Sequence, residues 1–260
     1  MSKKLNEKII RRDIEVELVD SMGNDFDIEK AARISYNRFK NEGEFRPAEK
    51  TINLVRRLFW HRHTSPFEMV EFKFFVEIPI FVARQIIRHR TASVNELSRR
   101  YTSSNIEFFN FELRYEDKSI TNQGSGDAVN SEFYYNSVES VERKALETYN
   151  MLVSEGIANE TARVVLPHTL MTAWVWKIDL HNLLHFLNLR DDSHAQKETR
   201  KVAQRCLELI EPVVPITVAA YKDWKKLMSI FMKVGYNYYK GGKVEELAEF
   251  LESVEIFDND

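Results

Sequence analysis

Residues 68–90 read EMVEFKFFVEIPIFVARQIIRHR, and this stretch decides how the chain folds. Hydrophobic side chains occupy every second position over Glu68–Ile78, which predicts a strand with one buried face. Pro79 suits the first turn of a helix, so we expect the strand to lead directly into a helix over Pro79–Arg90. Residues three or four apart share one face of a helix. This helix would therefore present a polar, cationic face made of Arg84, Gln85, Arg88 and His89.

On either side of this stretch, strands come early in the chain and helices come late. Alternating patterns predict two further strands, Ile14–Val19 and Asn105–Tyr115. A loop is expected over Ser119–Asn130. This order favours an α+β fold in a single domain over residues 1–260. Helices are expected from an N-cap at Asp27 to Ser35, from near Pro47 to about His63, and over Glu132–Ser154, Thr161–Leu166, Leu180–Leu189, Ser193–Glu211 and parts of Pro215–Val254.

The composition excludes several classes of protein. The 260 residues include 37 Lys and Arg against 40 Asp and Glu, so the net charge of −3 argues against a general nucleic-acid coat protein or a basic membrane binder. The single cysteine, Cys206, permits neither an intrachain disulfide nor a cysteine-based zinc site. No signal sequence and no run of about 20 apolar residues occurs. We expect a cytoplasmic protein without membrane or nucleic-acid partners.

Glycine is scarce, and its scarcity limits how the chain could hold a nucleotide. There are eight glycines, and they form neither a G-x-G-x-x-G turn nor a G-x-x-x-x-G-K-[ST] loop. Arginine side chains would have to bind the phosphates instead. Residues 84–101, RQIIRHRTASVNELSRRY, supply five arginines. A solvated basic helix end would explain Arg88 and Arg90 but not the polar run SVNELS that follows, so both interpretations are open on composition alone.

The spacing within this stretch is more specific than its composition. Arg88-His89-Arg90 is followed by Ser93, Asn95-Glu96, Ser98 and Arg100, which gives the pattern R-H-R-x-x-S-x-N-E-x-S-x-R. This pattern resembles the signature of the flavin-dependent thymidylate synthases, the ThyX family. Further segments resemble the family over residues 14–224, and residues 225–260 form a C-terminal extension. These segments are 31–35 (AARIS), 63–68 (HTSPFE), 79–85 (PIFVARQ), 162–167 (ARVVLP), and 187–190 (LNLR) with 193–196 (SHAQ).

The resemblance implies a fold, a reaction and an assembly. The fold would be ThyX-like, with an antiparallel or mixed sheet and a helical C-terminal half. The enzyme would be a methyltransferase that converts dUMP to dTMP, with 5,10-methylenetetrahydrofolate as carbon donor. FAD would carry the hydride and NADPH would reduce the flavin. The assembly would be a homotetramer whose neighbouring subunits share active sites.

The resemblance also assigns residues to the two ligands, and Arg190 is the expected catalytic residue, beside the pyrimidine. The dUMP site would contain Gln85, Ile86, Ile87, Arg88, Glu96, Leu97, Ser98, Arg99, Arg100, Arg163 and Arg190. The FAD site would contain Ser65, Arg88, His89, Arg90, Glu96, Asp179, Leu180, His181 and His185.

The chemistry of a uracil ring explains why arginine would be needed. Carbon 5 is a poor nucleophile, and the flavin-free solution is a cysteine that adds to carbon 6. Cys206 lies in an amphipathic helical stretch where a packing role is more common. A guanidinium such as Arg190 near the ring carbonyl would instead stabilise the electron-rich pyrimidine, since arginine keeps its charge throughout. Ser98 has no obvious base near it in sequence, so we interpret it as a hydrogen-bond donor to the nucleotide.

Three other interpretations compete with this one. His181 and His185 have a spacing that suits a metal, but the sequence offers no obvious third ligand, so we expect no metal site. An RNA- or nucleotide-binding module would use the arginines for phosphates and the aromatic residues for stacking on bases. A flavin enzyme with a different reaction, such as an NADPH oxidase-like activity or a modified pyrimidine substrate, would use the same arginines.

Overall fold

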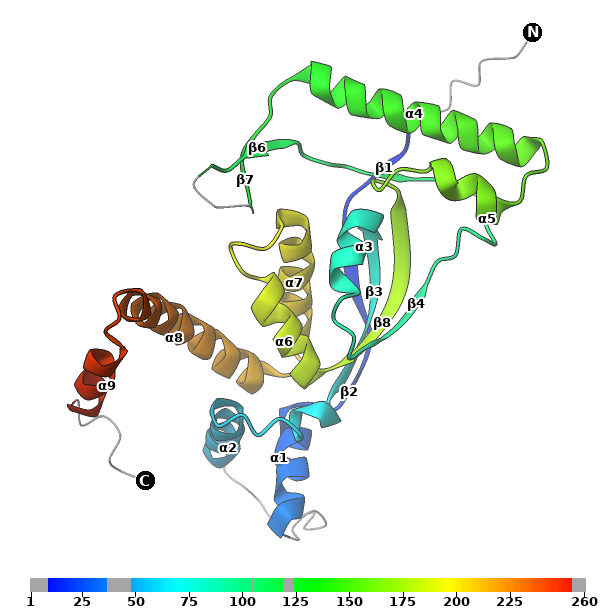
Figure 1. Cartoon of the computed structure of the whole chain (residues 1–260). Helices are drawn as coiled ribbons and strands as arrows, with labels where there is room; N and C mark the ends of the chain where they lie inside the picture. The colour runs from blue at the N-terminus through cyan, green and yellow to red at the C-terminus, as the bar shows by residue number, and fades with distance from the viewer. Residues whose placement is uncertain (1–8, 37–47, 104, 119–123, 254–260) are drawn as a thin grey trace.

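The computed structural model describes residues 9–36, 48–103, 105–118 and 124–253. Its centre is an antiparallel four-stranded sheet in the order β2-β3-β8-β4 (Figure 1). Two short pairs lie outside it, the parallel pair β1-β5 and the antiparallel pair β6-β7. The strands are β1 (Arg11–Arg12), β2 (Glu15–Met22), β3 (Glu71–Pro79), β4 (Ser93–Glu96), β5 (Phe108–Phe109), β6 (Arg114–Glu116), β7 (Ser125–Ala128) and β8 (Met171–Asp179).

Helices make up most of the rest of the described chain, so the expected α+β class is confirmed. Six of the nine helices of the described residues follow residue 131, as the sequence predicts for the C-terminal half. The helices are α1 (Asp25–Arg33), α2 (Ala48–Trp60), α3 (Ile80–Ile86), α4 (Glu132–Ser154), α5 (Asn159–Ala162), α6 (Leu180–Arg190), α7 (Lys197–Ile210), α8 (Pro215–Lys240) and α9 (Val244–Ser253). Short 3₁₀ turns cover Ile34–Tyr36, Phe67–Met69 and Arg163–Val165.

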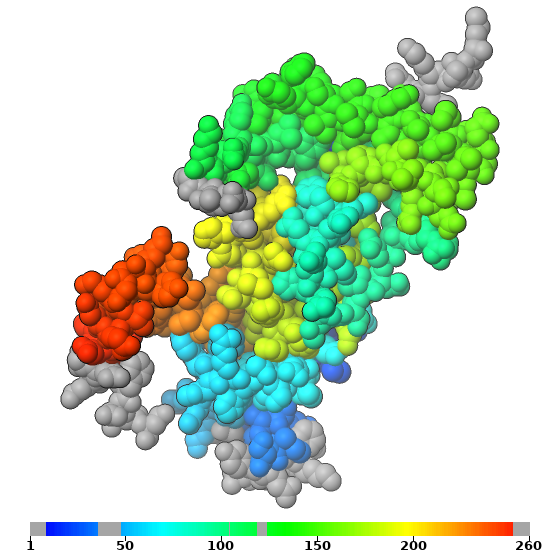
Figure 2. All heavy atoms as spheres, in the orientation of Figure 1, coloured from blue at the N-terminus to red at the C-terminus, as the bar shows by residue number. Residues whose placement is uncertain are grey.

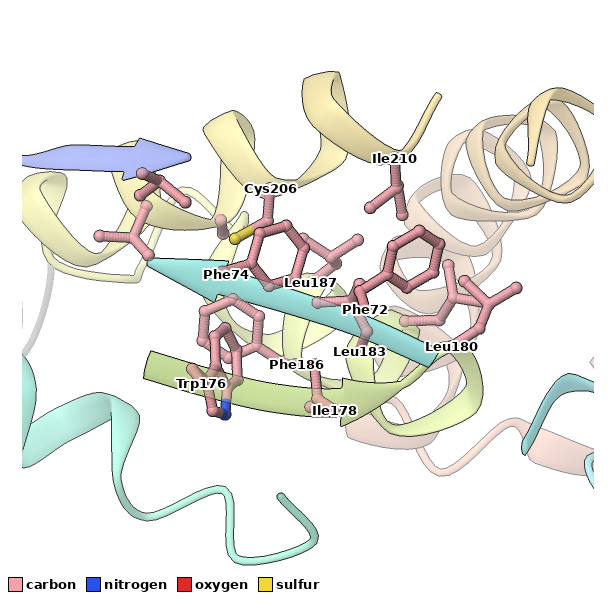
Figure 3. Packing of buried hydrophobic residues seen from close by; sticks show 14 of the residues in the cluster. Phe72, Phe74, Trp176, Ile178, Leu180, Leu183, Phe186, Leu187, Cys206 and Ile210 are labelled. Carbon is pink, nitrogen blue, oxygen red and sulfur yellow. The ribbon is translucent and has the colours of Figure 1, made fainter. Parts of the chain in front are cut away.

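The main core lies between the sheet and the helices α6 and α7. Phe72 and Phe74 of β3 alternate toward it, opposite Trp176 and Ile178 of β8, and all four side chains are fully buried (Figure 3). Trp176 meets the ring of Phe186 edge-on, with the centroids 5.1 Å apart. Burial of large aromatic side chains is the main source of stabilisation in such a core. It holds β3 and β8 rigidly under α6.

A second, smaller core ties the long helix α4 to the β1-β5 pair. Tyr149 of α4 and Phe108 of β5 are fully buried there together with Leu170, just before β8. Arg11 of β1 reaches the buried carboxylate of Glu142 on α4, with 2.6 Å between Nη2 and Oε2. The two cores lie next to each other along the chain at β8, since Trp174 and Trp176 of this strand belong to the main core and Leu170, just before it, belongs to the second.

Several element boundaries differ from the sequence-based expectations. The strand after the turn begins at Glu71 because Phe67–Met69 form a 3₁₀ turn. The first helix begins at Asp25, and its N-cap is Asn24, whose side chain accepts the Phe26 N–H while Asp27 caps in return. The helix α7 begins at Lys197 rather than Ser193.

Three further expectations about the sheet and its loops are wrong. The expected strand Asn105–Tyr115 is interrupted, with only Phe108–Phe109 and Arg114–Glu116 extended and paired. The expected loop Ser119–Asn130 contains β7, and residues 119–123 of it lie outside the described residues. The strand β8 appears in a region where only helices were expected.

The helix α3 also ends earlier than expected, at Ile86, with Ile87 as its C-cap. Arg88, His89 and Arg90 therefore lie beyond the helix and do not continue its face. The chain turns at this point, since the His89 N–H donates to the Ile86 carbonyl at 3.0 Å, and then enters β4. This turn sets the direction of the signature arginines.

Candidate active site

The site forms where the C-terminal ends of two helices, α3 and α6, converge. The strand β3 runs into α3 and β8 runs into α6, and because the two strands are antiparallel the helices start at opposite ends of the pair. Their C-terminal ends meet, where Arg190 Nε donates to His89 Nε2 at 3.0 Å. Helix C-terminal ends carry partial negative charge and stabilise cations. The fold thus brings together two residues that are 101 positions apart in the chain.

His89 is held as a neutral hydrogen-bond acceptor. Burial, and then the positive charges of Arg190 and His185, lower the pKa of His89 to about 4 from an ordinary value of 6.5. Its ring meets Phe186 edge-on, with the centroids 5.0 Å apart. The acceptor role of Nε2 places the ring proton on Nδ1. A neutral imidazole can therefore orient the guanidinium of Arg190 near neutral pH.

The lowered pKa of His89 predicts a pH dependence of stability. Between pH 6.5 and about 4 the unfolded chain binds a proton at His89 and the folded chain does not, so this contribution to stability is lost as the pH falls through that window. We expect the wild-type Tm to fall more between pH 7 and pH 5 than the Tm of a His89→Gln variant, whose side-chain oxygen can still accept from Arg190. Thermal unfolding followed by circular dichroism at both pH values measures the difference. Parallel curves would contradict the assignment.

Gln85 lines a cavity that we call the larger cavity, and contacts at the start of α7 hold its side chain in place. Its side-chain oxygen accepts from Thr199 Oγ1 at 2.9 Å, and its amide donates to Gln196. The cavity of about 720 Å³ is lined by both glutamines and by Arg190. Three further cations, three polar side chains and one carboxylate line it, and composition alone did not single them out: Arg114, Lys197, Arg200, Ser125, Ser193, His194 and Asp117. Of these, only Ser193 and His194 had a signal in the sequence, the segment SHAQ that precedes α7.

A second cavity, of about 260 Å³, contains the signature arginines. It is lined by Arg88, His89 and Arg90 from the turn after α3, and by His185 and Arg190 from α6. No aspartate or glutamate occurs among the described residues that line it. Arg190 lines both this cavity and the larger one. A cationic lining without carboxylates suits an anionic ligand.

A third cavity, of about 100 Å³, adjoins the second through His185. His63 and Thr64 line it next to Ser65, and His181 lines it from α6. Aromatic side chains close it, among them Tyr221 and Trp224 of α8, which the sequence analysis did not select. Three of the residues predicted for FAD therefore lie in or beside this cavity.

Two other residues predicted for FAD have structural roles within the single chain. Asp179 is the N-cap of α6, where its carboxylate accepts the Asn182 backbone N–H at 2.9 Å and the Asn182 side-chain amide at 2.7 Å. Leu180 is fully buried in the main core. Neither lines the three cavities described above.

A second group of predicted residues lies along β4, the loop that follows it, and the 3₁₀ turn Arg163–Val165. Glu96 accepts from Thr172 Oγ1 at 2.6 Å, and Arg100 Nη2 lies 3.2 Å from a carboxylate oxygen of Glu160. Arg99 is buried and donates to the Asn105 carbonyl at 2.9 Å. None of the residues in this group lines the cavities that hold Gln85 and Arg190; the group comprises Glu96, Leu97, Ser98, Arg99, Arg100 and Arg163. A single chain thus divides the predicted dUMP residues between two places.

Among the described residues, the structure offers neither a cluster of metal ligands nor a helix that could span a membrane. No group of three or more His, Cys, Asp or Glu residues has an arrangement that would hold a metal ion. None of the helices described is both long and apolar enough to cross a membrane.

The fold is shared with a nucleotide-modifying enzyme of known structure. The crystal structure of PolB from Streptomyces cacaoi, a UMP/dUMP methylase bound with 5-Br dUMP, superposes with a TM-score of 0.76 at 34% sequence identity. The match covers 83% of this chain and 97% of PolB. The PolB structure bound with 5-Br UMP gives a TM-score of 0.73 at 33% identity, over 84% and 98% of the two chains. The chain therefore belongs to the class of ThyX-like methyltransferases.

The family follows from the sequence comparisons. Residues 17–216 match the family model described as thymidylate synthase complementing protein, and the chain belongs to that family. Relatives from Ehrlichia ruminantium, 43% identical over 217 residues, and from Thermus thermophilus, 45% identical over 208 residues, are flavin-dependent thymidylate synthases. The matches cover 80% of this chain and 70% and 75% of those relatives. The resemblance inferred from the arginine signature is confirmed.

Proposed function

We propose that this enzyme methylates dUMP to dTMP, with the methylene group of 5,10-methylenetetrahydrofolate as the carbon source, FAD as the hydride carrier and NADPH as the reductant of the flavin. In balance, dUMP, methylenetetrahydrofolate, NADPH and one proton give dTMP, tetrahydrofolate and NADP⁺. The observation that carries the proposal is the position of Arg190, which lines both the cavity of Gln85 and the cavity of the R-H-R signature.

The larger cavity is the proposed site of the uracil ring. Gln85 offers an amide that α7 holds in place, and Arg190 offers a guanidinium that His89 orients. The positive charge of Arg190 next to the ring carbonyl stabilises negative charge on the pyrimidine, which makes carbon 5 a better nucleophile. No covalent bond between enzyme and substrate is required. Ile86 and Ile87 connect Gln85, at this cavity, to Arg88, which lines the second cavity.

We assign the flavin cofactor to the residues around the second and third cavities, with part of the cofactor outside them. Arg88 and Arg90 supply guanidinium groups for a diphosphate, and the cavity they line has no carboxylate among its described residues that would repel it. The hydrophobic walls of the third cavity, including Trp224, suit an aromatic ring system, beside Ser65, His181 and His185. FAD, when bound there, supplies the hydride for the new methyl group. Arg190 then stands between the cofactor and the substrate.

A complete site requires a neighbouring subunit. Glu96, Ser98, Arg99, Arg100 and Arg163 line none of the three cavities described above, so we assign them to the dUMP site of another copy. The two phosphate-binding groups proposed on that side, Arg100 and Arg163, are exposed on the surface that a partner would cover. This division supports the proposed homotetramer with shared active sites, built from one domain per chain.

The test is an absorption spectrum followed by an activity assay. The purified enzyme should be yellow, and it should release tritium from [5-³H]dUMP when methylenetetrahydrofolate and NADPH are added. UMP should be assayed in parallel, since PolB is a UMP/dUMP methylase. A protein that stays colourless with added FAD would exclude the flavin. Salt-sensitive binding of oligonucleotides by a colourless protein would favour the nucleic-acid module instead.

The absence of a cysteine nucleophile gives a separate prediction. Cys206 lies fully buried in the main core on α7, and this burial raises the pKa of its thiol well above the ordinary value (Figure 3). A protonated thiol sealed in a core cannot add to a uracil ring. We expect Cys206→Ala to keep tritium release close to the wild-type rate, at some loss of thermal stability from the small cavity. Loss of turnover in a variant that still folds would contradict the mechanism.

A further inference from the structure

The last part of the chain forms an arm that lies outside the catalytic fold. We use the name terminal arm for residues 225–253, which comprise the distal part of α8 and the helix α9. The match to the family model ends at residue 216, before the arm begins. The first turns of α8 pack into the main core through Val218 and Tyr221. Beyond Lys225, which still pairs with Asp191 at the end of α6, the arm stands away from the body, as the orange and red lobe in Figure 2 shows.

The arm exposes a broad hydrophobic surface. From Leu227 onward, apolar side chains occupy more than half of the circumference of α8. None of the described side chains of residues 222–251 is buried. Met232 is 71% exposed and Tyr239 is 70% exposed. The arm holds ten large hydrophobic side chains that are exposed: Leu227, Ile230, Phe231, Met232, Val234, Tyr236, Tyr239, Val244, Phe250 and Leu251.

The size of this surface matches what a specific protein interface needs. Ten large side chains at these exposures present on the order of 1,000 Å² of surface, since one aromatic side chain alone has roughly 150–250 Å². A standard interface buries about 800 Å² on each partner. Monomeric proteins rarely expose a contiguous apolar patch of this extent. The arm therefore carries the area of one half of a stable interface.

The charges of the arm identify the partner. Residues 226–240 of α8 contain three lysines and no acidic residue, Lys226, Lys233 and Lys240, whereas Lys225 pairs with Asp191 of its own chain. The helix α9 contains four glutamates and no basic residue: Glu245, Glu246, Glu249 and Glu252. A two-fold axis that pairs two arms antiparallel places the basic helix of each beside the acidic helix of the other. An anionic membrane would attract α8 and repel α9.

We propose that the terminal arm pairs with the arm of a second copy of this chain, hydrophobic face to hydrophobic face. The contact is isologous, so the same surface serves both partners. It is separate from the shared active sites proposed above, because none of residues 225–253 lines the three cavities described there. The arm is thus an oligomerisation element that lies outside the catalytic fold.

The chain offers a clean crosslinking test. Its one native cysteine, Cys206, is buried and unreactive, so a single cysteine introduced on the arm is the only accessible thiol. Phe231 lies on the hydrophobic face, and Ser229, two residues away, lies on nearly the opposite side of the helix. The full-length Phe231→Cys and Ser229→Cys variants are treated with a short bis-maleimide at the same dilute concentration. Covalent dimers are then measured on a denaturing gel.

We expect a yield of covalent dimer from Phe231→Cys several-fold above that from Ser229→Cys. Adding Tyr239→Glu, which places a charge on the same face, should lower the Phe231→Cys yield toward that of the control. Equal yields from the two cysteine positions, or a yield that Tyr239→Glu leaves unchanged, would overturn the proposal. Binding of the wild-type chain to phosphatidylserine vesicles in a sedimentation assay, with no crosslink, would assign the face to a membrane instead.

Discussion

Replacing Arg190 with alanine should lower the turnover by at least about 10²–10³-fold and leave the flavin bound, because the lost charge acts on the pyrimidine in the transition state. Arg190 lines both the substrate cavity and the cavity of the R-H-R signature, but it is only one of several cations around the latter. Tritium release from [5-³H]dUMP measures the turnover, and the visible absorption spectrum of the purified variant measures the flavin. Both readouts come from the same preparation.

Two further variants separate the charge of Arg190 from its shape and from the net charge of the protein. Arg190→Lys keeps the charge but loses the Nε–H that donates to His89, so we expect a turnover between those of the wild type and the alanine variant. Arg205→Ala removes an arginine from an exposed face of α7, where it pairs with Glu208, and should change nothing. Wild-type turnover in Arg190→Ala would show that another group activates the ring.

Local sequence patterns correctly predicted those strands and helices in which the hydrophobic residues recur with the period of the element itself. The alternation of Phe72, Phe74 and Val76 in β3 is regular, and all three side chains are fully buried on one face. The long helix α4 begins and ends where its pattern does, at Glu132 and Ser154. In these elements the local preference and the tertiary environment agree.

The elements that were missed owe their structure to partners far away in the chain. The strand β8 reads MTAWVWKID, a mixed pattern that lies between two helical segments, and its conformation is set by β3 on one side and β4 on the other. The polar segment Ser93–Glu96 has no strand pattern of its own and becomes β4 by pairing with residues 174–177 of β8. The same pairing draws the chain away after Ile86 and ends α3 early. No local pattern contains this information.

In the site, likewise, the sequence identified candidate residues, but only the fold determines which of them are in contact. The arginine signature selected Arg88, His89 and Arg90, and the resemblance added Arg190, but the hydrogen bond between His89 and Arg190 depends on the convergence of α3 and α6. Arg114 could not be selected from the sequence, because its place at the larger cavity depends on a buried ion pair with Glu198 of α7, 2.6 Å long. Spacing along the chain identifies which residues do chemistry, and the fold decides which of them meet.

The second large effect that we expect is complementation between two inactive variants. It follows from the separation of the predicted dUMP residues into two groups. Arg190→Ala removes the group that acts on the ring, and the double variant Arg100→Ala/Arg163→Ala removes two cations proposed for the phosphate. Each hydrogen bond to a charged group is worth about 1.5–3 kcal/mol, so the double variant should lose about 10²-fold or more in kcat/KM. Each variant alone, as a homo-oligomer, should therefore be nearly inactive.

Assemblies that contain both variants should regain activity if a site draws its two groups from different chains. With equal amounts and random assembly, half of the Arg190 positions and half of the Arg100/Arg163 positions are intact, so about a quarter of the sites are complete. The two variants are co-expressed at equal levels, and all assemblies are purified together through a tag that both variants carry, so that the rate is averaged over every site in the sample. Tritium release near a quarter of the wild-type rate would support shared sites. If both groups belonged to one chain, no complete site could form and the mixed assemblies would stay as inactive as their parents, so the recovered rate separates the two architectures without reference to the oligomer's size.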